Sequence, residues 1–80
     1  MNISPSAQAE FDGLPKEMKR RMAAAFERLS QWPQLSGAKP MTGEFVGSYR
    51  LRTGDYRVVF RVRGAQLTVI RIGHRKDVYD

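Results

Sequence analysis

The residues best suited to chemistry in this 80-residue chain are arginines that alternate with large apolar side chains. The stretch YRLRTGDYRVVFRVR, residues 49–63, contains five of them. Because successive side chains of a β-strand point to opposite faces, this spacing gathers the arginines on one face and the apolar residues on the other. Guanidinium groups bind phosphates and carboxylates through paired hydrogen bonds and remain charged. The stretch therefore predicts an anion-binding surface, called here the Arg face, which consists of Arg50, Arg52, Arg57, Val59, Arg61 and Arg63.

An ordinary solvated sheet face is the alternative, but the composition of the Arg face favours binding. Solvated faces usually mix charges of both signs, whereas this one contains no carboxylate. A turn at Gly54-Asp55, or one that spans residues 53–56, places Arg52 directly opposite Arg57, although a three-residue loop would shift that pairing. Like charges at opposed positions destabilise a sheet, and a local conflict of this kind is typical of functional sites.

The net charge of +6 is concentrated in the same half of the chain. Residues 1–48 contain six basic and five acidic side chains, whereas residues 49–80 contain eight basic and three acidic ones. Seven of those eight are arginine, which indicates a polyanionic partner. Nucleic acid is the first expectation, and an acidic protein is the second.

Length and composition predict a single small domain over residues 1–80 in the cytoplasm. The chain contains no cysteine, so it can form neither a disulfide nor a thiolate site. Its first residues lack the basic and apolar regions of a signal peptide, and no apolar run approaches the ~18 residues of a membrane span. We therefore expect a soluble protein with no membrane partner.

Two helices are predicted in the first half of the chain. Ser4 followed by Pro5 is a typical helix start, and Gly13 ends this first helix. The second helix begins at residues 14–15 and is expected to end near Gln31, because apolar residues at helical spacing continue to that point. The two helices are expected to pack as a hairpin.

The second half of the chain is predicted to form three antiparallel strands. Residues 34–47 contain three glycines and a proline and are expected to form a loop. Turn signals at residues 54–55 and 64–65 then separate strands at about 48–53, 56–63 and 67–73. The apolar face of the first two strands is expected to cover the helices, and it consists of Tyr49, Leu51, Tyr56, Val58, Phe60 and Val62.

The chain lacks the residues of most catalytic sites. It has one histidine, and no group of His, Asp and Glu has metal-ligand spacing, so no metal or cofactor is expected. Its serines lie far from that histidine in sequence, which argues against a nucleophilic triad. The residues do suit metal-free cleavage of RNA, because the 2′-hydroxyl beside the scissile phosphate is the nucleophile and fixed cations can neutralise the developing charge.

The end of the sequence, IGHRKDVYD over residues 72–80, supplies the remaining candidates. His74 can accept or donate a proton near neutral pH. Tyr79 becomes a base only where neighbouring cations favour its phenolate. Either residue alone would more often be structural, but both lie close in sequence to Arg75 and follow the Arg face. The proton acceptor stays open between His74 and Tyr79.

These motifs together resemble the RelE/ParE superfamily of bacterial and archaeal type II toxins. The resemblance covers nearly the whole chain, and it rests on LP at 14–15, YRLR at 49–52, GDYRVVF at 54–60 and IGHRKDVY at 72–79. It implies an α+β fold in which an N-terminal helical hairpin packs on a curved antiparallel β-sheet of three to four strands. The fourth would be a short N-terminal strand, for which little beyond Asn2-Ile3 is present.

The resemblance also implies an activity, because RelE-type members cleave mRNA in the ribosomal A site without a metal. Arg57 matches a phosphate-contacting arginine, Arg75 a catalytic arginine, and Tyr79 a tyrosine that stacks on a base or aids proton transfer. Arg50 and Arg52 stand where the family often has lysine, and a guanidinium cannot act as a base. The expected catalytic residues are Arg57, Arg75, Tyr79 and His74, and the expected RNA-binding residues are Arg50, Arg52, Arg61 and Lys76.

The partners implied by the resemblance are a cognate antitoxin, which wraps and neutralises the toxin in a hetero-oligomer, and the ribosome with its mRNA. Two other functions stay open. One is a ParE-like gyrase inhibitor with the same fold, and the other is a nonenzymatic module whose Arg face binds RNA or an acidic protein. The presence of both Arg75 and Tyr79 favours the endoribonuclease, because ParE members generally lack the full closing set.

Overall fold

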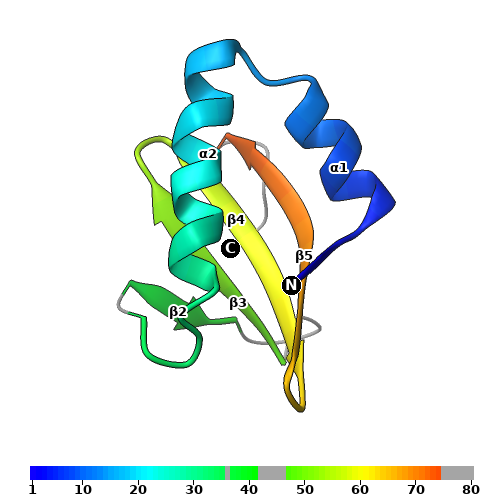
Figure 1. The fold of residues 1–80 in the computed structure, drawn as a ribbon, viewed down its shortest axis with the longest axis vertical. Coiled ribbons are helices and arrows are strands. Elements are labelled where there is room, and N and C mark those ends of the chain that lie inside the picture. The colour runs from blue at the N-terminus through cyan, green and yellow to red at the C-terminus, as the bar shows by residue number, and fades with distance from the viewer. Residues whose placement is uncertain (36, 42–46, 75–80) are drawn as a thin grey trace.

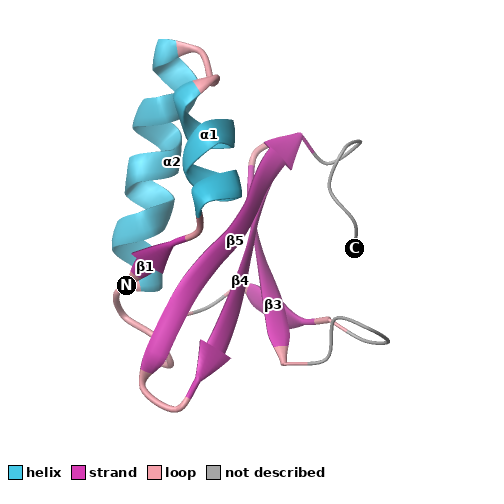
Figure 2. Ribbon diagram, turned by 90° about the vertical axis from the view of Figure 1, so that its right-hand side faces the viewer, coloured by secondary structure: helices cyan, strands magenta, loops and turns pink. Residues whose placement is uncertain are grey.

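The computed structural model describes residues 1–35, 37–41 and 47–74, and in this part of the chain two helices cover one face of a five-stranded sheet (Figures 1 and 2). The spatial order of the strands is β1-β5-β4-β3-β2. No helix within the described residues combines the length and apolar composition needed to cross a bilayer. The elements are β1 (Asn2–Ile3), α1 (Pro5–Asp12), α2 (Lys16–Leu29), β2 (Ala38–Pro40), β3 (Ser48–Thr53), β4 (Tyr56–Arg63) and β5 (Gln66–His74).

The predicted α+β class, the helical hairpin and the three antiparallel strands of the second half are confirmed, but the sheet has five strands rather than three to four, and one of them is parallel. β1 adds a parallel strand beside β5, so the sheet is mixed rather than antiparallel. β2 lies in the segment expected to be a loop and pairs antiparallel with β3. A strand of three residues between glycines and prolines has no detectable period, because its order comes from hydrogen bonds to β3 rather than from its own side chains.

The two helices begin as local signals predict. The hydroxyl of Ser4 accepts a hydrogen bond from the N–H of Ala7 at 3.1 Å, which caps α1, and Pro5 occupies its first turn. Gly13 follows the last residue of α1. α2 ends at Leu29, slightly before the predicted end near Gln31, and the chain continues from there as a turn.

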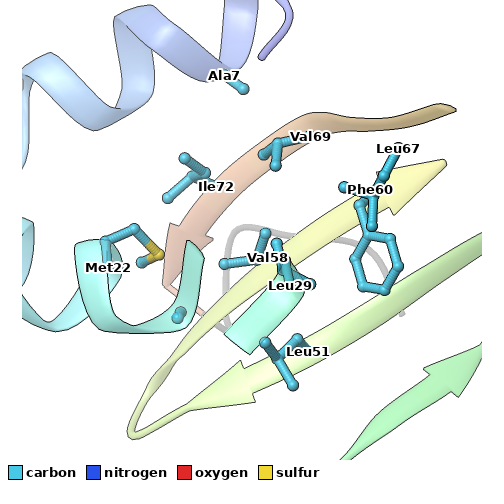
Figure 3. Packing of buried hydrophobic residues seen from close by; sticks show 10 residues of the cluster. Ala7, Met22, Leu29, Leu51, Val58, Phe60, Leu67, Val69 and Ile72 are labelled. Atoms are coloured by element: carbon cyan, nitrogen blue, oxygen red, sulfur yellow. The ribbon is translucent and has the colours of Figure 1, made fainter. Parts of the chain in front are cut away.

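The core lies between the helices and one face of the sheet (Figure 3). Val58 and Phe60 of β4 are fully buried there, together with Met22 and Leu29 of α2. The ring of Phe60 also meets the Trp32 ring edge-on at 5.5 Å. The apolar face predicted from the alternation is confirmed, because its members all belong to this core or pack against it: Tyr49, Leu51, Tyr56, Val58, Phe60 and Val62.

The pairing of β3 with β4 follows the predicted register. Leu51 lies opposite Val58, and Arg52 lies opposite Arg57. The turn between the strands needs a positive φ, and Gly54 supplies it at 62° without steric cost. The Arg face therefore points away from the helices along both strands, because the helices lie against the opposite, apolar face.

The pairing of β4 with β5 contains one irregularity. Val59 lies opposite Arg71 and Phe60 opposite Val69, so Ile70 is an extra residue at a β-bulge. Ile70 packs against Val59 and Met41 in a small apolar cluster that is separate from the main core. The bulge thus places an apolar side chain beside the Arg face.

Residues of α1 cover the edge of β5 beyond its short pairing with β1. The N–H of Ser4 donates to the carbonyl of Val69 at 2.8 Å. Glu10 accepts the backbone N–H of Ile72 at 2.9 Å, and its other oxygen pairs with Nε of Arg71 at 3.2 Å. An exposed strand edge invites pairing with other chains, so these contacts protect β5 as well as anchoring α1.

Replacing Glu10 should show what this edge contact contributes. Glu10→Ala removes the acceptor for the Ile72 N–H and the partner of Arg71, and we expect the free energy of unfolding to fall by about 1–2 kcal/mol, as for a lost charged hydrogen bond. Glu10→Gln keeps an acceptor oxygen and should lose less. Urea unfolding measures both variants, with the exposed Gln8→Ala in the same helix as the control. A change in Glu10→Ala no larger than that of the control would contradict this role.

Candidate functional site

The Arg face lies on the side of the sheet opposite the helices, and no helix within the described residues covers it (Figure 2). β4 contributes side chains to both faces of the sheet. Its apolar residues enter the core, whereas Arg57 and Arg61 point to the opposite side. The rigidity of a central strand suits a binding surface, since a site built on strands holds its geometry better than one built on loops. The position predicted for the Arg face follows from this alternation.

Three arginines of the Arg face meet a lysine from β2 around a small depression of about 70 Å³. Lys39 lies opposite Arg50, and Arg52 lies opposite Arg57, so the strand pairings bring all four cations together. We call this site the basic pocket, and its lining residues are Gly37, Lys39, Arg50, Arg52 and Arg57.

Within the basic pocket the cations differ in exposure. Arg52 and Lys39 are exposed, whereas Arg50 and Arg57 are half-buried. Nε and one terminal nitrogen of Arg57 are buried. Arg50 and Arg57 also make contacts with other groups of the chain, so their side chains are held in place. Two half-buried guanidiniums beside two exposed cations form a site that can bind and orient an anion.

Across β4 from the pocket, Gly73 of β5 pairs with Arg57. A glycine contributes no side chain, so nothing from β5 at this position crowds the guanidinium. Gly73 lies one residue before the end of β5 at His74, so Arg57 and the basic pocket lie at this end of the sheet.

A second and larger depression of about 340 Å³ lies at the other end of the Arg face. Arg61, which we expected to bind the same ligand as Arg50 and Arg52, lies here with Arg63. The apolar cluster of Val59, Met41 and Ile70 is adjacent, and Ile70 contributes to the wall. We call this site the distal hollow, and its lining residues are Arg61, Arg63, Gln66, Thr68 and Ile70.

His74 does not share the face of the arginines. It lies opposite Tyr56, and their rings meet edge-on with centroids 5.5 Å apart. Tyr56 packs against the main core, so the imidazole is on the helix side of the sheet, whereas Arg57 points to the other side. The structure therefore does not bring His74 and Arg57 together, and a catalytic role for His74 stays a prediction.

Three other predicted site residues, Arg75, Lys76 and Tyr79, lie outside the described residues. Within the described residues, no three His, Cys, Asp or Glu side chains come together in a way that could hold a metal ion. The roles assigned to these three residues remain predictions from the sequence.

Sequence reasoning missed Lys39 and Gly37 as members of the basic pocket. Both belong to the segment that was expected to be a loop, and only the pairing of β2 with β3 brings Lys39 beside Arg50. Gly37 has φ of 94°, and a Cβ at this position would lie 3.1 Å from a terminal nitrogen of Arg28. A lysine between two short glycine- and proline-containing segments is a weak signal, and nothing in its spacing pointed to the Arg face.

Relieving the like-charge contact in the basic pocket should stabilise the fold. Arg52→Thr removes one of two guanidiniums opposed across β3 and β4, and we expect the free energy of unfolding in dilute buffer to rise by about 0.5–1 kcal/mol. Arg63→Thr is the matched control, because its partner across the strands is the uncharged Gln66. Urea unfolding with and without phosphate provides the measurement, and phosphate should stabilise the wild type more than Arg52→Thr. Equal changes in the two variants would show that the pocket holds no charge conflict.

Comparison with known proteins identifies a family and agrees with the fold. The model of the family described as "ParE toxin of type II toxin-antitoxin system, parDE" matches residues 1–79. Toxin RelG of Mycobacterium tuberculosis (strain ATCC 25618 / H37Rv) is 34% identical over 82 residues, which covers 99% of this chain and 93% of the relative.

Solved structures share the fold. The RelB-RelE antitoxin-toxin complex from Methanococcus jannaschii contains a chain with a TM-score of 0.80 at 23% identity, covering 100% of this chain and 96% of that one. The toxin-antitoxin complex RelBE2 from Mycobacterium tuberculosis contains one with a TM-score of 0.76 at 28% identity, covering 92% and 94%. The chain therefore belongs to the RelE/ParE superfamily of toxins from type II toxin-antitoxin systems.

Proposed function

We propose that this toxin is a metal-independent endoribonuclease that cleaves mRNA in the ribosomal A site. The observation that supports this proposal most directly is the basic pocket, in which three arginines and a lysine surround a depression sized for a small anion. A phosphate of the RNA backbone is the ligand that planar, permanently charged guanidiniums bind best. The 34% identity to a protein named as a toxin of the Rel type adds to this support.

The proposed reaction uses the RNA itself as the source of the nucleophile. The 2′-oxygen attacks the adjacent phosphorus while its proton passes to a base, a 2′,3′-cyclic phosphate forms, and the bond to the 5′-oxygen breaks. The 5′-oxygen leaves with a proton from an acid. Negative charge increases on the phosphate oxygens during this step, and preorganised cations stabilise it most effectively because they need not reorient. DNA lacks the 2′-hydroxyl, so the reaction is specific for RNA.

The pocket residues carry the electrostatic part of this mechanism. Arg57 is half-buried and held, so it is assigned to the non-bridging oxygens of the scissile phosphate. Arg50, Arg52 and Lys39 contact the same phosphate or its neighbour. No arginine can accept the proton of the 2′-hydroxyl, because a guanidinium stays protonated in proteins.

Proton transfer is assigned to Tyr79, with Arg75 beside it, rather than to His74. The reason is that the imidazole of His74 lies on the face of Tyr56, away from the basic pocket. Tyr79 follows His74 by five residues in the sequence, and His74 is the last residue of β5, at the end of the sheet where Arg57 lies. Lys76 is assigned a supporting role in binding RNA.

The proposed partners are a cognate antitoxin in a hetero-oligomer, and the ribosome with its mRNA, in the cytoplasm. Two of the similar structures are complexes of a toxin with an antitoxin. An acidic segment of such an antitoxin would be attracted to the concentrated positive charge of the Arg face. The same surface would then bind either the antitoxin or the RNA. The antitoxin would therefore neutralise the toxin by preventing RNA from binding.

Gyrase inhibition is the second candidate function, and one observation favours it. The family model that matches residues 1–79 is described as a ParE toxin. In that case the basic pocket would bind a different anionic surface, and no phosphodiester bond of RNA would be cleaved. The fold is common to both activities, so only an assay separates them.

Cleavage of mRNA by the purified chain on programmed ribosomes tests the endoribonuclease proposal. We expect codon-specific cuts, and a loss of about 10²-fold in rate for Arg57→Ala, the usual cost of removing one charge-stabilising group. Primer extension on the mRNA maps the cuts. Tyr79→Phe should also lose activity, whereas His74→Ala should lose much less. Arg20→Ala, an exposed arginine of α2, is the control and should cleave at the wild-type rate.

Two results would contradict the proposal. The first is cleavage that survives when a 2′-deoxynucleotide precedes the scissile phosphate, because the nucleophile would then be absent. The second is intact mRNA together with inhibition of DNA supercoiling by gyrase, which would instead support the ParE-like function. Binding of RNA that weakens with salt, without cleavage under any condition, would indicate a nonenzymatic module.

Co-expression with the product of the adjacent open reading frame tests the antitoxin proposal. We expect a complex that remains intact during purification and does not cleave mRNA. Exchanging Arg50 and Arg52 for glutamate should weaken the complex at least tenfold in calorimetric titration, because buried like charges cost several kcal/mol. Glutamate at Lys16 and Arg20 on α2 makes the same change in charge and should have little effect. Equal weakening by both pairs would place the antitoxin elsewhere.

A further inference from the structure

We propose that the distal hollow is a second RNA-binding subsite, which holds a nucleotide of the same strand whose scissile phosphate lies in the basic pocket. This inference rests on the proposed function, because it assigns a further part of the substrate to the same face. The subsite consists of Arg61, Arg63, Gln66, Thr68 and Ile70. Neither the family nor the catalytic chemistry requires it.

The two sites are aligned along one strand. Arg57, Arg61 and Arg63 are separated by even numbers of residues along β4, so their side chains lie on the same face of the sheet. A single extended ligand can therefore contact all three. At ~3.3 Å per residue, Arg61 lies about 13 Å from Arg57 and Arg63 about 20 Å from it. These separations exceed the reach of one nucleotide, so a ligand that fills both sites must be an oligonucleotide.

The hollow contains the groups that recognise a nucleotide. Its volume of about 340 Å³ is at the lower end of the range for small-ligand sites. Arg61 and Arg63 are exposed, which leaves their planar guanidiniums available to contact phosphate or to stack on a base. Ile70 provides an apolar wall, because the bulge of β5 packs it against Val59.

Two polar groups of the hollow are suited to the edge of a base. The Oε1 atom of Gln66 accepts a hydrogen bond from Nδ2 of Asn2 at 2.6 Å, so the amide is oriented and its Nε2 hydrogens are directed to other acceptors. Thr68 is half-buried in the hollow and can both donate and accept. An oriented amide next to a hydroxyl reads a base edge, whereas a plain phosphate site would need only cations.

An acidic protein segment could also meet two arginines, but the hollow suits RNA better. A peptide of alternating carboxylates would use the arginines and leave the amide, the hydroxyl and the apolar wall unmatched. A nucleotide combines an anion, a flat apolar ring and polar edges in one unit. The alignment of the hollow with the basic pocket along β4 also favours RNA, because a row of cationic sites matches the phosphates of a linear polyanion.

Oligonucleotides of increasing length test the subsite with the purified full chain. The probes are 2′-O-methyl RNA as a dinucleotide, a tetranucleotide and a hexanucleotide, which cannot be cleaved because the 2′-oxygen is blocked. Fluorescence anisotropy over a range of salt concentrations gives the affinity and its salt dependence. For the wild type we expect tighter binding with length, and a salt slope that increases by about 0.7 for each added phosphate contact.

The double variant Arg61→Gln with Arg63→Gln should lose roughly tenfold in affinity for the hexanucleotide and reduce its salt slope by about 1.4. Its affinity for the dinucleotide should not change, which also shows that the variant is folded. Lys16→Gln with Arg20→Gln on α2 removes the same charge and should leave both probes unaffected. Thr68→Val, nearly the same in shape, should weaken the hexanucleotide alone by a few-fold.

The outcomes separate this proposal from the proposed function. Equal losses for all probe lengths, no loss in the double variant, or affinity that is independent of length in the wild type would each overturn the subsite. Dependence on Arg61 and Arg63 for a polyglutamate peptide, but not for the hexanucleotide, would assign the hollow to an acidic protein and also overturn it. A chain that binds the hexanucleotide through the hollow but never cleaves mRNA would overturn the endoribonuclease and leave the subsite standing.

Discussion

The alternation of side chains along β4 is the constraint on which the rest of this structure depends. One set of residues, including Val58 and Phe60, fills the core beneath the helices, and the other set presents Arg57 and Arg61 to the opposite side. A shift of one residue would send arginines into the core and expose the apolar groups, so the register cannot vary. The same burial that stabilises the fold therefore determines where the positive charge lies.

Concentrating charge on one face has a cost that the core must offset. Arg52 and Arg57 are directly opposed, and Lys39 and Arg50 form a second pair of like charges in the adjacent strands. A protein of this size has a thin margin of stability, because a small domain buries a limited share of its surface. Such a conflict between like charges is typical of a functional site. An anionic partner would then stabilise the fold while it binds.

The division of the Arg face into two sites has a structural origin in β5. The bulge at Ile70 adds one residue, which brings an apolar side chain against Val59 and Met41 between the arginines of β3 and those at the far end of β4. Bulges commonly redirect side chains beside functional sites. Membership of the RelE/ParE superfamily explains the framework of two helices on a sheet, whereas the hollow at Arg61 and Arg63 depends on details of this chain. Fold and site are thus separate properties here.

Features that repeat over a few residues could be predicted from the amino-acid sequence. The cap at Ser4, the turn at Gly54, the pairing of Arg52 with Arg57 and the separation of the two faces of β3 and β4 all follow from local propensity and a period of two. The same information sufficed to identify the arginines as the candidate site, because they recur at alternating positions in two strands that are adjacent in the sequence.

Features that depend on residues distant in sequence could be seen only once the chain was folded. β1 joins β5 as a parallel strand, and β2 brings Lys39 beside Arg50, through hydrogen bonds that leave no periodic trace in such short segments. The pairing of β5 with β4 places His74 on the side of Tyr56, and the bulge places Ile70 beside Arg61 in the distal hollow. These outcomes depend on which strands pair and in which register, and that is settled by the free energy of the whole sheet rather than by any one strand.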